Sequence, residues 1–205
     1  RRVLFRSDVL VPYYRDTAVQ LMRGVRMEDI LLYWGGDERG SDYAEPLAAQ
    51  DFPICVPIAT QALHACGVAS AFRIRGEHRV AVTTCGDGAT SKGDFLEALN
   101  VAGAWQLPVL FVVNNNQWAI STFQAIAGGE GTTFANRGVG CGIASLRVDG
   151  NDFLAVYAAS EWAAERARRE GLHLIPAFHP WLVAGVASYS LELFAALADL
   201  RSEEH

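Results

Sequence analysis

The chain has 205 residues, of which 51% are hydrophobic and 20% are charged, and its formal net charge at pH 7 is −6. This composition indicates a globular domain with a sizeable core rather than a disordered chain. The negative charge argues against non-specific nucleic-acid binding and against an anionic membrane surface. We recognise no membrane-spanning apolar run and no signal peptide, and therefore expect neither a nucleic acid nor a membrane as partner.

The four cysteines are scattered through the chain and form no C-x-x-C pair. We expect each to pack as a small apolar residue in a reducing compartment, rather than to form a disulfide or bind zinc. The sequence therefore predicts a cytoplasmic protein.

The two ends of the chain, residues 1–7 and 201–205, resemble translated sequencing adapters. We expect both to be non-native and leave them out of the fold prediction. Residues 8–169 are predicted to form one domain, and residues 170–200 are left unassigned.

The domain opens with an apolar run at 9–11 and two helical patterns, at 17–23 and 27–34. After a polar, glycine-rich loop, residues 53–61 lead into a helix of small residues at 62–72. Such small residues permit close packing against another helix, either in the core or at a contact between subunits. Gly103 and Ala104 raise the same two possibilities, and the sequence leaves both open.

A strand–helix–strand unit lies at the centre of the chain. The apolar runs 80–85 and 109–113 read as buried strands, and 95–102 between them has a helical pattern. Such βαβ units are parallel and almost always right-handed.

Polar residues follow both strands, with Asp87 after the first and Asn114, Asn115 and Asn116 after the second. Ligands of open parallel sheets bind outside these carboxyl ends. A carboxylate, a side-chain amide and a backbone carbonyl suit Mg²⁺, which also takes oxygens from a substrate diphosphate.

The remaining predicted elements are a third strand at 144–148, a turn at 149–152 and an amphipathic helix at 153–169 that covers a sheet face. The glycines between 123 and 142 form no G-x-G-x-x-G. The turn at Gly86–Gly88 also lacks this dinucleotide pattern, because Ser91 stands where its third glycine belongs.

Gly86-Asp87-Gly88, followed after about thirty residues by Asn115-Asn116, resembles the thiamine diphosphate motif. The similarity extends through residues 88–95 and 116–122. These residues resemble the alpha subunit of the thiamine diphosphate-dependent 2-oxo acid dehydrogenases, which is the first component of those complexes. The resemblance implies an α/β fold of three layers, α/β/α, with a mainly parallel sheet. A bare βαβ turn with capping Asp and Asn residues is the plainer alternative.

The resemblance also implies which residues hold the cofactor and its ion. Asp87, Asn116 and the Trp118 carbonyl match the family's Mg²⁺ ligands. The positions that match cofactor contacts are Tyr14, Arg15, Val56, Ile58, Gly86, Asp87, Gly88, Ala89, Asn116 and Trp118. No catalytic residue is assigned, because the family's active-site histidine falls in a loop that this sequence does not match.

The implied activity is oxidative decarboxylation of pyruvate with acyl transfer to a lipoyl group, or the same reaction on a branched-chain 2-oxo acid. The implied partners are a beta subunit, in a heterotetramer of two alpha and two beta subunits, and the lipoyl acyltransferase core. The carboxylate that activates the cofactor's aminopyrimidine belongs to that beta subunit. We expect the isolated chain to be inactive.

The resemblance is mixed along the chain. Up to Asn116 the amino-acid sequence is similar to that of pyruvate-type members, and from 118 to 169 it is similar to that of branched-chain members. Either one protein carries both signatures or two relatives have been joined. The family pattern stops after residue 169, which a frameshift, a misjoin or a divergent helix would explain.

Two rival readings predict different behaviour. A Rossmann-type nucleotide-binding module would bind NAD without Mg²⁺, whereas the enzyme subunit would bind thiamine diphosphate only with it. A non-functional chimera would melt broadly and respond to no ligand.

Overall fold

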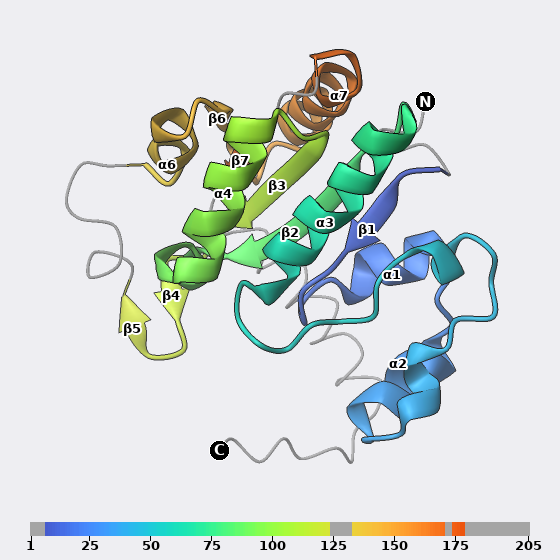
Figure 1. Cartoon of the computed structure of the whole chain (residues 1–205). Coiled ribbons are helices and arrows are strands. Elements are labelled where there is room, and N and C mark those ends of the chain that lie inside the picture. The colour runs from blue at the N-terminus through green and yellow to red at the C-terminus, as the bar shows by residue number, and fades with distance from the viewer. Residues whose placement is uncertain (1–6, 124–132, 171–173, 179–205) are drawn as a thin grey trace.

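The computed structural model describes residues 7–123, 133–170 and 174–178. Within these residues, five strands form a parallel sheet in the order β1-β2-β3-β7-β6 (Figure 1). The strands are β1 (Val9–Val11), β2 (Ala81–Gly86), β3 (Val109–Asn114), β6 (Ala144–Arg147) and β7 (Leu174–Phe178). The short strands β4 (Trp118–Ala119) and β5 (Thr122–Phe123) form a separate antiparallel hairpin.

The α-helices are α1 (Thr17–Arg23), α2 (Met27–Trp34), α3 (Thr60–Arg75), α4 (Gly93–Trp105), α6 (Ala135–Gly140) and α7 (Phe153–Glu170). Three 3₁₀ turns complete the described elements: η1 (Glu38–Ser41), η2 (Ala48–Gln50) and η3 (Asp87–Ser91). None of the helices in the described part of the chain is long and apolar enough to cross a membrane.

The alternation of side chains along the strands assigns one set of residues to each face of the sheet. Val9, Val11 and Phe111 pack with α3 and α4 in one core cluster. Leu10 and Leu110 point to the other face, where they pack with α7. Helices cover both faces, and the central strands β2 and β3 are buried along most of their length. The three-layer α/β/α prediction is therefore confirmed (Figure 1).

The direction of strand addition explains which helix covers which face. From β1 to β2 and on to β3 the chain advances across the sheet, with α3 and α4 as crossovers on one side. From β6 to β7 it steps back towards β3. A right-handed crossover in the reverse direction must lie on the opposite face, and α7 does so.

The predicted strand–helix–strand unit is confirmed as β2, α4 and β3, with boundaries shifted by a few residues. The predicted strand at 144–148 and the helix at 153–169 correspond to β6 and α7. The sequence left 170–200 unassigned, and the backbone of β7 within it pairs with both β3 and β6.

Gly103 lets α4 approach the end of α6 closely. A Cβ atom on this residue would lie 2.1 Å from the carbonyl oxygen of Cys141, a contact that no side chain can make. Gly103 therefore serves close packing within the chain, which decides between the two possibilities that the sequence left open for it. At Gly67 on α3, by contrast, an added Cβ would meet nothing within 4 Å.

Candidate functional site

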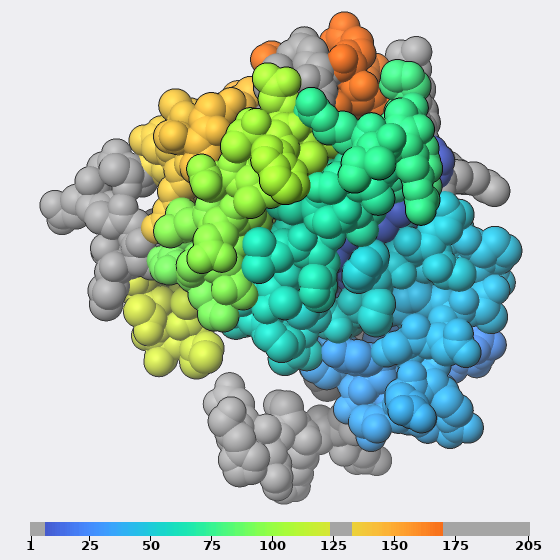
Figure 2. All heavy atoms as spheres, in the orientation of Figure 1, coloured from blue at the N-terminus to red at the C-terminus, as the bar shows by residue number. Residues whose placement is uncertain are grey.

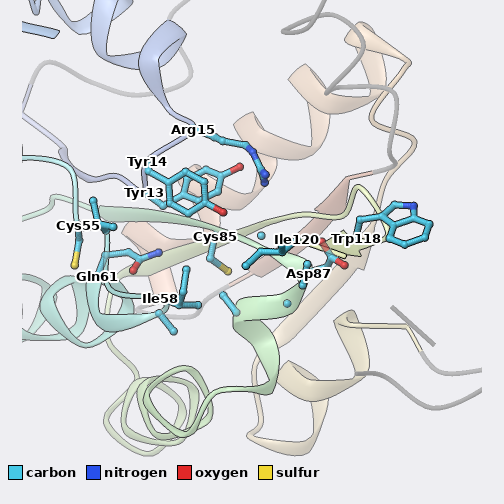
Figure 3. A pocket seen from close by; sticks show the side chains of 16 residues that line it. Tyr13, Tyr14, Arg15, Cys55, Ile58, Gln61, Cys85, Asp87, Trp118 and Ile120 are labelled. Carbon is cyan, nitrogen blue, oxygen red and sulfur yellow. The ribbon is translucent and has the colours of Figure 1, made fainter. Parts of the chain in front are cut away.

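A cavity of about 220 Å³ lies at the carboxyl edge of the sheet (Figure 3). Its walls come from the end of β1, the segment before α3, the turn after β2 and the hairpin after β3. All the cofactor residues predicted from the sequence except Asn116 line it: Tyr14, Arg15, Val56, Ile58, Gly86, Asp87, Gly88, Ala89 and Trp118. Segments up to about a hundred residues apart in the sequence thus meet at one edge, as parallel sheets favour.

Asp87 is the buried charge of this cavity. It begins η3 directly after β2 and is only 1% exposed. Burial raises the pKa of its carboxyl, while hydrogen bonds from the backbone N–H groups of Asp87 and Asn116 oppose the rise. Its Oδ2 atom is buried and has no hydrogen-bond partner among the described residues. A buried carboxylate oxygen without a partner is costly, and a bound cation would satisfy it.

Asn116 lies beside Asp87 but does not line the cavity. Its Oδ1 atom accepts a hydrogen bond from the backbone N–H of Trp118 at 3.0 Å. Asn115 makes the same kind of contact with the N–H of Gln117 at 2.9 Å, and Gln117 adopts a φ of 67°. These local bonds fold residues 114–118 into a tight turn. An amide oxygen has a second lone pair, so Asn116 can also face an ion.

The donor set around Asp87 consists of oxygen atoms. Among the described residues, no group of three or more His, Cys, Asp or Glu side chains is placed to hold a metal. A metal here would therefore rely on one carboxylate together with amide and carbonyl oxygens. Such ligands suit a hard cation that keeps some of its water, such as Mg²⁺, and do not suit zinc.

Gly88 permits the hairpin to close over the turn. A Cβ atom on Gly88 would lie 2.4 Å from the Cβ of Ala119, on β4. The absence of a side chain at Gly88 therefore allows the backbone of the turn after β2 to approach β4. Figure 2 shows the hairpin, in yellow, projecting beside the green η3–α4 region at the lower left of the molecule.

Tyr14 and Arg15 follow β1. The Arg15 guanidinium lies 5.1 Å from the centre of the Tyr14 ring, which is within the range of a cation–π contact. Its positive charge also partly offsets the raised pKa of Asp87. Arg15 thus provides positive charge to the cavity within electrostatic range of Asp87. Figure 3 shows its side chain beside Tyr14 and above Asp87.

Val56 and Ile58 form the apolar side of the cavity. They are 50% and 43% exposed although both are aliphatic. Trp118 is likewise 51% exposed. Apolar surface left open beside a buried carboxylate is typical of a ligand site with an apolar and an ionic part.

The structure adds residues that the sequence did not single out. The further lining residues are Tyr13, Cys55, Ala59, Gln61, Cys85, Ala119 and Ile120. Gln61 is 2% exposed and donates to the carbonyl oxygen of Thr84 at 2.8 Å. The alternation along β1 could have revealed Tyr13, because it continues the face of Val9 and Val11.

His64 is exposed on α3 and lies with its ring 5.9 Å from that of Phe52, outside the cavity lining. His173 and His179 lie outside the described residues. None of the histidines that the structure describes lines the cavity.

Comparison with known proteins gives concordant results. The profile of the family described as "Dehydrogenase E1 component" matches residues 2–177. The chain is 48% identical over 196 residues to the 2-oxoisovalerate dehydrogenase subunit alpha of Pseudomonas aeruginosa, covering 90% of this chain and 46% of the relative. It is 44% identical over 168 residues to the pyruvate dehydrogenase E1 component subunit alpha of Acholeplasma laidlawii, covering 82% of this chain and 48% of the relative.

A solved structure shares the fold. It is the X-ray structure of an enzyme from Mycobacterium smegmatis described as thiamin diphosphate-dependent, with a TM-score of 0.56 and 19% sequence identity. The match covers 86% of this chain and 29% of that one. The chain spans slightly less than half the length of the curated relatives that it matches.

Proposed function

Because this chain belongs to the dehydrogenase E1 component family, we propose that it acts as the alpha subunit of a thiamine diphosphate-dependent 2-oxo acid dehydrogenase. The observation that carries this proposal is the buried Oδ2 atom of Asp87. It has no partner among the described residues, and it lies at a cavity on the carboxyl edge of the sheet. The residue types around it fit a divalent ion and a diphosphate.

Asp87, Asn116 and the carbonyl group of Trp118 would hold Mg²⁺. The support for this assignment is that these residues supply a carboxylate, an amide oxygen and a backbone oxygen from neighbouring turns. The ion would neutralise the Asp87 carboxylate, whose charge is disfavoured by burial.

The diphosphate would lie against the turn from Gly86 to Ala89. The space beside Gly86 is open, since a Cβ atom there would meet nothing within 4 Å, and this allows close backbone approach. Arg15 would pair with phosphate oxygens, since its planar guanidinium presents two parallel donors. Tyr14 lines the same side of the cavity. Val56 and Ile58 would pack against the apolar middle of the cofactor, which requires the exposed aliphatic surface seen there.

Bound thiamine diphosphate supplies the nucleophilic carbon and the electron sink for decarboxylation of a 2-oxo acid. The described residues bind and orient it, and none of those lining the cavity is assigned a proton-transfer step. A volume of about 220 Å³ is below the range of about 300–1,000 Å³ of sites that enclose a ligand. This supports a site completed by a second chain, for which a beta subunit is our proposal.

The substrate is proposed to be pyruvate, with acyl transfer to the lipoyl group of an acyltransferase core. Similarity to a 2-oxoisovalerate dehydrogenase subunit favours a second candidate, a branched-chain 2-oxo acid. Turnover of the two acids in competition, by the chain assembled with a beta subunit, decides between them. The acid with the higher kcat/KM value in this competition is the preferred substrate.

The direct test is a thermal melt of the chain co-expressed with a beta subunit, with Mg²⁺ and with or without thiamine diphosphate. At a free concentration of 100 times its dissociation constant, the cofactor should stabilise the folded protein by about 2.7 kcal/mol. This corresponds to a rise in melting temperature of roughly 5–10 °C. The shift should require Mg²⁺ and vanish in Asp87→Ala, and it should persist in Asp42→Ala, which removes an exposed carboxylate outside the cavity. A folded wild-type complex without the shift would refute the proposal, and an NAD-dependent shift without Mg²⁺ would favour a nucleotide-binding module.

A further inference from the structure

Tyr13 lines the cavity in a position that hydrogen bonds of its backbone fix. Its side chain lines the cavity and the residue is 4% exposed. Its N–H donates a hydrogen bond to Oδ2 of Asp16 at 3.1 Å and lies 3.4 Å from the hydroxyl oxygen of Thr84. These bonds attach the end of β1 to the end of β2. They therefore fix the backbone position from which the Tyr13 side chain extends.

The Tyr13 hydroxyl reaches across the sheet to β3. It accepts a hydrogen bond from Nδ2 of Asn114 at 3.0 Å. β2 lies between β1 and β3, and Asn114 is paired in register with Gly86. The phenol therefore spans the carboxyl end of β2, one residue before Asp87.

The proton of this hydroxyl is available to a ligand. Burial, followed by the charge of Asp16, raises the pKa of Tyr13 to about 12, so the hydroxyl keeps its proton at neutral pH. Its oxygen accepts the Asn114 bond, and no residue in the described part of the chain accepts its proton. Figure 3 shows the Tyr13 ring beside that of Tyr14, with the Arg15 side chain next to them.

Positive charge lies close to the same hydroxyl. The Arg15 guanidinium partly offsets the raised pKa values of both Tyr13 and Asp87, which places it near both side chains. An anionic group attracted by Arg15 towards the Asp87 turn would enter the region that the Tyr13 hydroxyl faces.

We propose that the Tyr13 hydroxyl donates a hydrogen bond to a phosphate oxygen of the bound diphosphate, and that Asn114 orients the hydroxyl for this contact. The inference rests on the proposed cofactor and adds two residues to its binding site. Tyr13 contacts the ligand, whereas Asn114 is a positioning residue that acts through Tyr13.

The test compares Tyr13→Phe with Tyr43→Phe. Tyr43 is a matched control, because it is also buried and its hydroxyl also accepts a hydrogen bond from an amide, Nε2 of Gln20 at 2.9 Å, but it does not line the cavity. Calorimetric titration of the full chain in complex with a beta subunit gives the dissociation constants of thiamine diphosphate and inorganic pyrophosphate, each with Mg²⁺. Tyr13→Phe should weaken both by about tenfold to a hundredfold, as expected for one hydrogen bond to a charged group. Tyr43→Phe should change neither.

Asn114→Ala tests the orienting role and retains the Tyr13 hydroxyl. It should weaken pyrophosphate binding less than Tyr13→Phe does, and it should add no further loss when combined with Tyr13→Phe. Additive losses would overturn the orienting role. Melting of each cofactor-free complex identifies any variant that has lost its fold.

Unchanged affinity of Tyr13→Phe for both ligands would overturn the inference while leaving the proposed function in place. A raised KM for the 2-oxo acid, with unchanged affinity for thiamine diphosphate, would overturn it as well, because the hydroxyl would then serve the substrate. Failure of the folded wild-type complex to bind thiamine diphosphate would instead refute the proposed function, and the inference with it.

Discussion

The hydroxyl group of Thr84, on β2, donates a hydrogen bond to the carboxyl group of Asp16, which lies just before α1. Both residues are nearly inaccessible to solvent, at 8% and 4% exposure. The same carboxyl oxygen accepts the N–H of Tyr13 at 3.1 Å. Asp16 therefore fixes the turn that carries Tyr14 and Arg15 to the cavity.

Asp16 should make the stability of the chain depend on pH. Its carboxyl has an ordinary pKa of 3.8, which burial raises to about 7 in the folded chain. Between these values the folded state binds more protons than the unfolded state, so the free energy of unfolding falls as pH rises from about 4 to about 7. Asp16→Asn should therefore gain stability relative to wild type over this range, by up to a few kcal/mol.

Urea unfolding of wild type and Asp16→Asn at a series of pH values measures this difference. The difference between the two proteins isolates Asp16, because all other titrating groups are shared. A stability difference that does not change between pH 4 and 8 would show that the carboxyl titrates alike in the folded and unfolded chains.

Gly88→Ala should displace the β4–β5 hairpin from the turn after β2. The new Cβ would lie 2.4 Å from the Cβ of Ala119, and overpacking of this kind costs about 1–3 kcal/mol. Thermal melting measures the loss of stability, and calorimetry with Mg²⁺ and thiamine diphosphate measures the loss of affinity. Combining Gly88→Ala with Ala119→Gly removes the opposing carbon, and this double variant should recover most of the lost stability and affinity. No rescue would mean that the backbone of Gly88, rather than this contact, limits substitution.

Gly103→Ala and Gly67→Ala should have effects of opposite sign, although both glycines lie within helices. At Gly103 the added carbon meets the Cys141 carbonyl oxygen at 2.1 Å, so α4 and α6 must separate, at a cost of about 1–3 kcal/mol. At Gly67 the added carbon meets nothing within 4 Å. Alanine there should stabilise by about 0.5–1 kcal/mol through its higher helix propensity.

Urea midpoints of the two single variants check these signs. A destabilised Gly67→Ala variant would indicate that the exposed face of α3 is covered by another chain in solution. A neutral Gly103→Ala variant would contradict the close approach of α4 to Cys141.

Arg23→Ala should be strongly destabilising. Its guanidinium bonds both carboxylate oxygens of Asp51, at 2.6 and 2.7 Å, and the carbonyl oxygen of Asp8 at 2.8 Å. The two side chains are 9% and 4% exposed, so removing one leaves a buried, unpaired charge. We expect a loss of about 3–5 kcal/mol in urea unfolding.

Arg39→Ala provides the comparison. Arg39 also forms a bidentate ion pair, with the carboxylate of Asp37, but the Arg39 side chain is 78% exposed. Solvent screens that pair, and its removal should leave the urea midpoint unchanged within error. Equal effects of the two substitutions would show that burial does not decide the strength of these pairs.

Three features could be predicted from the amino-acid sequence: the βαβ unit, the position of Asp87 and Asn116 after neighbouring strands, and the resemblance from which the cofactor residues are proposed. These features depend on local patterns: apolar runs of strand length, a helical repeat between them and polar residues where the strands stop. Hydrophobic periodicity is set by near neighbours in the chain, so it can be read without knowing what packs against it.

The contacts between residues far apart in the chain were set by the three-dimensional fold. It inserted β7 between β3 and β6, brought Ala119 against Gly88, and placed Asn114 beside Tyr13, 101 residues away in the sequence. It also buried Asp16, whose raised pKa no local pattern indicates. Such contacts follow from strand register and from the packing of helices on the sheet. Both are set by the fit of segments that are far apart in the chain, and therefore by no pattern within any one of them.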